Sequence, residues 1–232
     1  MPGRDGLFLH EEILLLALRD EAGTFASGTQ YSFGMGGAIL AELLLDERIR
    51  VVTPKKTPLA EVVGFGRVGD PVIDECLQKV RDAKKRASLQ TWVSRFAHIK
   101  DLRHRVARRL ARRGILRVDQ DKVLLIFNRT IYPELDPGPE RRILERLRNA
   151  IFGGATDIDP RTVALVALAH HTGLLSANFD KKELKERKDR IDRIINGDLT
   201  ARATKAAIEA MQAAVMVACI VPAIMTTTIA SR

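Results

Sequence analysis

The chain has 232 residues, of which 46% are hydrophobic, so it can bury a sizeable core without disulfide bonds. Cys76 and Cys219 are the only cysteines and belong to no motif, which excludes a disulfide framework and fits a reducing cytosol. Lys and Arg number 38 against 29 Asp and Glu, and the formal net charge of +9 favours acidic partners.

The N-terminal half is expected to be helical with short strands. Apolar residues at helical spacing predict a helix over residues 9–19, and a loop rich in small residues follows at 22–37. Pro71 is typical of the first turn of a helix, and Ser88 is typical of a helix N-cap. The remaining expected elements are a helix at 38–45, a strand at 48–53 and a possible strand at 61–65.

The C-terminal half begins with a basic helix, Lys100 to Arg113, that holds seven Lys or Arg and one acid. A hairpin-like pair of apolar runs follows at 115–127, with an apparent turn at 119–122. Asp159 and Pro160 predict a helix N-cap and first position. Further helices are expected at 140–151, 181–195 and 200–225, after a loop at 133–139.

These elements do not alternate as βαβα units, so a parallel sheet is not expected. No long linker or internal repeat divides the chain. We therefore predict one mainly α domain over residues 1–232, with a projecting β-hairpin and minor short strands.

The uncharged C-terminal segment, residues 210–231, is long enough to span a bilayer. Gln212, Pro222 and three threonines dilute it, so a buried core helix is the better interpretation. The N-terminal apolar run follows two glutamates rather than a basic region, and it is not typical of a signal peptide.

No motif predicts catalysis, a metal or a cofactor. The glycines of residues 33–37 lack phosphate-loop spacing, which indicates a glycine-rich entry to a helix. His170 and His171 are adjacent, so on a helix they diverge by about 100° and cannot face one metal. No nucleophile elbow, kinase or deaminase signature is present.

The basic helix offers three interpretations. Ile99, Leu102, Val106 and Leu110 form a buried stripe, and Arg105, Arg108 and Arg112 lie opposite as a solvated face. Lys100 and Arg103 lie on the flank, where their tips can converge on one phosphate. The helix and hairpin could instead bind nucleic acid as a winged helix does, but the acidic turn suits a DNA backbone poorly.

Several segments, in order, resemble the Golgi phosphoprotein 3 family of peripheral membrane proteins that bind phosphatidylinositol 4-phosphate. The short chain, rich in Ala and Arg, resembles a prokaryotic member. The resemblance implies a single helical domain without catalytic activity, located in the cytoplasm and at a membrane surface. The matching segments are 7–20, 34–51, 70–82, 102–116, 123–127, 161–170 and the last expected helix, 200–225.

The resemblance also implies a site for an anionic headgroup. The two basic residues of the family pocket fall on Lys100 and Arg103. The family's pocket Trp and Arg fall on Ser27 and Gly36, which supply neither a ring nor a charge, and Tyr31, Phe25 or Phe33 can replace the aromatic.

The resemblance implies partners as well. The family's apolar hairpin tip, suited to membrane insertion or a homo-oligomer contact, falls on Val123, Leu124, Leu125 and Ile126. An anionic membrane lipid and the cytosolic tails of membrane proteins are the implied partners, and nucleic acid is not. An adaptor whose lipid pocket is vestigial is the other possibility.

Overall fold

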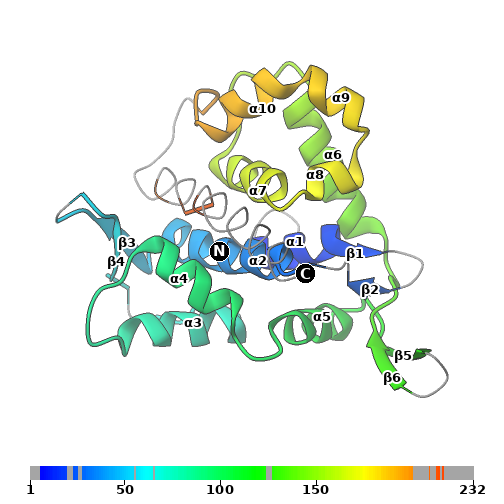
Figure 1. The fold of residues 1–232 in the computed structure, drawn as a ribbon, viewed down its shortest axis with the longest axis horizontal. Helices are drawn as coiled ribbons and strands as arrows, with labels where there is room; N and C mark the ends of the chain where they lie inside the picture. Colours follow the sequence, from blue (N-terminus) through cyan, green and yellow to red (C-terminus); the bar gives the residue numbers. More distant parts are fainter. Residues whose placement is uncertain are drawn as a thin grey trace, which may run out of the picture.

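The computed structural model describes residues 6–19, 23–25, 28–54, 56–64, 66–123 and 127–200, together with Glu209, Ala213, Ala214 and Met216. Helices dominate this part of the chain, and the strands form only short ribbons (Figure 1). The helices are α1 (Leu9–Ala17), α2 (Gln30–Leu45), α3 (Pro71–Arg81), α4 (Leu89–Ala97), α5 (Leu102–Arg112), α6 (Gly138–Phe152), α7 (Pro160–His171), α8 (Leu174–Asn178), α9 (Lys181–Glu186) and α10 (Lys188–Ile195).

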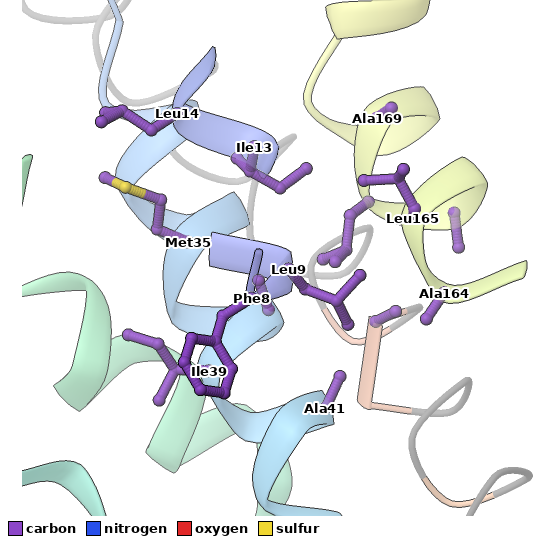
Figure 2. Close-up of a cluster of buried hydrophobic side chains, with 14 of the residues drawn as sticks. Phe8, Leu9, Ile13, Leu14, Met35, Ile39, Ala41, Ala164, Leu165 and Ala169 are labelled. Atoms are coloured by element: carbon purple, nitrogen blue, oxygen red, sulfur yellow. The ribbon is translucent and has the colours of Figure 1, made fainter. Parts of the chain in front are cut away.

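Three helices, α1, α2 and α7, make up the centre of the molecule. Every residue of α1 is buried. Helices α2 and α7 are also buried, except in their first turns and at their C-terminal ends. Helices that are apolar on all sides belong in a core. Figure 2 shows how Leu9 and Ile13 of α1 lie between α2 and Leu165 of α7.

The amphipathic helices cover this centre from two sides. Helices α3, α4 and α5 pack on one side, where α4 contacts α2 and α5 contacts α1 (Figure 1). Helices α6, α8 and α10 pack on α7 on the other side. The mainly α architecture with a projecting hairpin is therefore confirmed.

In the described part of the chain, the strands form three antiparallel two-stranded ribbons. In the last ribbon, Asp119 pairs with Ile131 and Val123 pairs with Phe127. Between these strands lie residues 124–126, which are outside the described residues. The ribbons are β1 (Leu18–Arg19) with β2 (Thr24–Phe25), β3 (Ile49–Val52) with β4 (Leu59–Val62), and β5 (Asp119–Val123) with β6 (Phe127–Ile131).

The expected turn at residues 119–122 is wrong, because these residues belong to β5. Asp121 lies directly opposite Arg129 in the ribbon, and the two side chains form an ion pair of 2.7 Å. Opposite charges facing each other across a ribbon stabilise it. Asp121 therefore supports strand pairing here rather than a turn.

The expected loop at 22–37 is wrong over its second half, because α2 begins at Gln30. Gly34 and Gly36 lie within this helix and allow close packing. A Cβ at Gly34 would lie 2.7 Å from Cγ2 of Thr172, and one at Gly36 would lie 2.5 Å from the carbonyl oxygen of Val93 in α4. Contacts with distant segments therefore explain why glycines lie inside this helix.

The other differences are smaller. The expected helix at 181–195 is two helices, α9 and α10, with Arg187 between them. Most of the expected helix at 200–225 lies outside the described residues, as does most of the segment 210–231. Within the described part of the chain, no helix has the length and apolarity needed to cross a membrane.

Candidate functional site

Helix α5 is anchored by its apolar stripe. Leu102, Val106 and Leu110 are buried, as is Ile99 just before the helix, which confirms the predicted stripe. Helix α5 contacts α1 and α3 through this side. The stripe therefore determines which basic side chains turn towards the domain and which face solvent.

Three arginines of the basic segment are held by carboxylates. Arg109 pairs with Glu11 at 3.1 Å and with Asp70 at 3.0 Å, and both acids are fully buried. Arg113 pairs with Glu11 at 3.1 Å, and Arg105 pairs with Glu75 at 2.6 Å. The expectation that Arg105 is fully solvated is therefore wrong, since its side chain is only 30% exposed.

Arg103 lies on a different side of α5, above an aromatic ring. Its guanidinium carbon is 5.3 Å from the centroid of the Phe25 ring in β2, a cation–π distance. Arg103, Phe25 and Tyr31 line one small hollow, which is too narrow to admit a water molecule and whose apolar wall is formed by α1 and α2. Leu14 and Met35 belong to this wall, and Figure 2 shows their side chains pointing to the same side.

Arg103 is half-buried and, among the described residues, forms no ion pair. The neighbouring His104 does not compete for anions, because burial, then Arg108 and Arg103, lower the pKa of its imidazole. Nδ1 of His104 lies 3.0 Å from the hydroxyl of Tyr132. Among the described residues that line this hollow, Arg103 is the one with a cationic side chain.

Lys100 does not share the hollow of Arg103. The helix begins only at Leu102, and Asp101 has a left-handed backbone conformation with φ of 54°. The exposed Lys100 lines a separate hollow of about 600 Å³ beside α3 and α4, together with Glu75, Trp92 and Arg95. Its expected position on the helix flank is therefore wrong, and its role as a ligand stays a prediction.

The remaining predicted site residues fall in three places. Tyr31 lines the hollow of Arg103, as does Phe25, one of the aromatic residues considered as a replacement. Gly36 faces the backbone of α4, so no side chain fits at this position. Ser27 lies outside the described residues.

The proposed hairpin tip is described only at Val123, the last residue of β5. Leu124, Leu125 and Ile126 lie outside the described residues. The role of these four residues as a membrane or oligomer contact stays a prediction.

The buried carboxylates of α1 and α2 were not expected as partners of distant arginines. Besides Glu11, Glu12 pairs with Arg146 at 2.6 Å, and Glu42 binds Arg161 through both of its oxygens. The sequence signal for these ion pairs was the presence of acidic residues within apolar helices, since carboxylates are rarely buried without a cation.

Fold and site together define a helical domain with a basic helix beside a β-hairpin and with an arginine held over an aromatic ring. The sequence model of the Golgi phosphoprotein 3 (GPP34) family matches residues 9–211, and the chain belongs to this family. It is similar to vacuolar protein sorting-associated protein 74 of Schizosaccharomyces pombe, with 25% identity over 220 residues. That match covers 81% of this chain and 65% of the relative, so the chain spans less than two thirds of the relative's length.

Proposed function

We propose that this chain is a non-enzymatic peripheral membrane protein that binds an anionic phospholipid headgroup at Arg103. The observation that carries the proposal is the half-buried residue Arg103, whose guanidinium stacks over Phe25 and has no acidic partner in the described part of the chain. Membership in the Golgi phosphoprotein 3 family supports it.

The position of Arg103 favours phosphate binding. Phe25 holds the guanidinium in place, so the side chain loses less freedom when it binds a ligand. The planar fork of donors matches a phosphate group, and each charge-assisted hydrogen bond contributes roughly 1.5–3 kcal/mol.

Lys100 supplies a second positive charge near the same headgroup. Three residues of fully extended chain span at most about 10 Å, so the Cα atoms of Lys100 and Arg103 are close neighbours. The lysine side chain is exposed and flexible, and it can turn towards a membrane that approaches Arg103. We therefore propose Lys100 as a supporting ligand rather than a member of the hollow.

The hairpin supplies an apolar contact. One weak lipid contact gives only marginal membrane binding, and stable anchoring takes two signals. In the sequence, Val123, Leu124, Leu125 and Ile126 form an apolar run, and the described strands β5 and β6 that flank it project from the domain as a ribbon (Figure 1). Insertion of these residues into the lipid would complement the headgroup contact.

Vesicle co-sedimentation tests this function. The chain is mixed with phosphatidylcholine vesicles that contain phosphatidylinositol 4-phosphate, or phosphatidylserine at matched surface charge. Arg103→Gln is expected to weaken binding by about tenfold or more, which corresponds to one lost charge-assisted contact. Lys100→Gln is expected to have a smaller effect, and Leu124→Ser with Leu125→Ser is expected to reduce binding to both vesicle types.

A matched control removes charge elsewhere. Arg187→Gln and Arg193→Gln change exposed residues at α9 and α10, on the far side of the domain from α5 (Figure 1). This double variant should bind vesicles like the unmutated chain. Equal binding by the Arg103→Gln and Lys100→Gln double variant would refute the headgroup site, and a salt-dependent gel shift of duplex DNA without vesicle binding would favour nucleic acid instead.

Two further measurements test the roles of the hairpin and of protein partners. If the leucine variant binds vesicles normally but loses self-association in sedimentation velocity, the hairpin is a contact between two copies of the chain. If the capture of cytosolic tails of membrane proteins survives loss of Arg103 and Lys100, the chain acts as an adaptor without the lipid site.

A further inference from the structure

A second hollow lies between α5 and the start of α3. It has a volume of about 140 Å³ and is lined by Pro71 and Val72 of α3 and by four arginines of α5. We call it the arginine hollow, and its arginines are Arg105, Arg108, Arg109 and Arg112.

The arginine hollow is separate from the hollow of Arg103. Successive helical residues turn by about 100°, so Arg108 and Arg112 lie about 140° and 180° around α5 from Arg103. The two hollows share no lining residue. Binding here therefore does not depend on the proposed headgroup function.

Two of the four arginines are held in place by ion pairs with carboxylates. Arg105 is bound by Glu75, and Arg109 is bound by Asp70 and Glu11. Asp70 also caps α3, because its Oδ1 accepts the N–H groups of Val72 and Ile73. These bonds hold the guanidinium groups of Arg105 and Arg109 at the wall of the hollow before any ligand arrives.

The other two arginines carry uncompensated charge. Arg108 and Arg112 are exposed and, among the described residues, neither forms an ion pair. They lie four positions apart on the helix, where like charges repel. The imidazole of His10, 3.7 Å from Asp70, adds no positive charge at neutral pH, because burial lowers its pKa.

We propose that the arginine hollow binds a phosphomonoester through Arg108 and Arg112. A phosphomonoester carries a charge of about −1.5 to −2 at pH 7, which matches the two uncompensated arginines. Two guanidinium forks bind phosphate oxygens in bidentate geometry, and Arg105 and Arg109 add a fixed positive wall. The volume of about 140 Å³ exceeds the roughly 30 Å³ that one water molecule occupies in the liquid, so it admits a group larger than water.

The same chemistry can come from a soluble phosphate ester or from a lipid with a monoester headgroup. The first arm measures the thermal unfolding of the full chain in glycerol 3-phosphate against sodium chloride at equal ionic strength. The ester is expected to raise Tm in a saturable manner, since it binds the folded chain. Arg108→Gln with Arg112→Gln is expected to weaken its apparent affinity at least tenfold.

Three comparisons make the first arm decisive. Glutamine is a good helix former, so the double variant should fold, and circular dichroism without ligand checks this. The Arg187→Gln and Arg193→Gln double variant loses the same charge and should keep the response. Lys100→Gln with Arg103→Gln should also keep it, which separates this site from the headgroup site.

The second arm measures flotation with vesicles that contain phosphatidic acid. If the Arg108 and Arg112 variant loses this binding as well, the site accepts a lipid source. If it loses only the response to glycerol 3-phosphate, the source is a soluble ester. A Tm response no larger than that of chloride, or an unchanged response in the Arg108 and Arg112 variant, overturns the proposal.

Discussion

Replacing Arg161 by methionine is expected to lower the free energy of unfolding by about 3–5 kcal/mol at pH 7, because it leaves the buried Glu42 without its cation. Glu42 lies in α2 and is fully buried. One of its oxygens accepts the N–H of Leu9 at 2.6 Å, and Nη1 of Arg161 donates to the other at 3.1 Å. Arg161 also donates to the carbonyl oxygen of Leu7 at 3.2 Å, so this ion pair joins the starts of α1 and α7 to α2.

Thermal or urea unfolding measures the loss. For a chain of this size, about 3–5 kcal/mol corresponds to a Tm decrease of roughly 6–20 °C. The double variant Arg161→Met with Glu42→Gln removes the uncompensated charge and is expected to be more stable than Arg161→Met alone. A loss below about 1 kcal/mol for Arg161→Met, or no recovery in the double variant, would show that the buried carboxylate of Glu42 does not need the charge of Arg161.

The loss should also depend on pH. Burial raises the pKa of Glu42, and Arg161 opposes this shift. Without Arg161 the pKa in the folded state rises further above the unfolded value, so the folded state binds the proton more tightly. Linkage then requires that the deficit of Arg161→Met relative to the unmutated chain shrinks as pH falls from 7 towards about 4.5, and a deficit that is constant with pH would contradict it.

Three further predictions concern stability. Gly36→Ala should lower the free energy of unfolding in urea by about 1–3 kcal/mol, because the new Cβ would lie 2.5 Å from the carbonyl oxygen of Val93. Gly154→Ala is the control: its Cβ would meet nothing within 4 Å, so the free energy of unfolding should change by less than about 0.5 kcal/mol. Burial, and then the charge of His170, lower the pKa of His171 to about 4, so the folded state resists protonation of this imidazole. The Tm of the unmutated chain should therefore fall as pH drops from about 6.5 to 4, and His171→Gln should make this decrease smaller. Asp159→Ala removes the cap of α7, in which Asp159 accepts the N–H of Thr162 at 3.0 Å, and should cost about 1 kcal/mol; an unchanged Tm would show that the cap contributes nothing.

The predicted helix starts at Pro71, Ser88 and Asp159 were correct because their signals are local. A capping side chain bonds to an N–H two or three residues away, and Ser88 and Asp159 each make such a bond. The apolar stripe of α5 was also correct, since helical periodicity alone places those residues on one side.

The candidate site was only partly predictable. The sequence indicated Arg103 and a small set of aromatic residues, of which Phe25 and Tyr31 lie at its hollow. It did not indicate that Lys100 precedes the helix, because the left-handed backbone of Asp101 interrupts a segment whose spacing is otherwise helical. Aspartate adopts this conformation only occasionally, whereas glycine adopts it readily, so Asp101 is a weak signal for such a break.

Composition and local pattern therefore determine that this chain is a basic, mainly helical domain with capped helices and one prominent basic helix. They do not determine which arginines of that helix are compensated. Glu11 lies 98 residues before Arg109, whereas Asp70 is the N-cap of α3 and Glu75 lies within that helix. Packing α1, α3 and α5 together brings these carboxylates to Arg105, Arg109 and Arg113. Arg103, Arg108 and Arg112 lie beyond the reach of these carboxylates and form no ion pair with the described residues, since charge compensation depends on distance in space rather than in sequence.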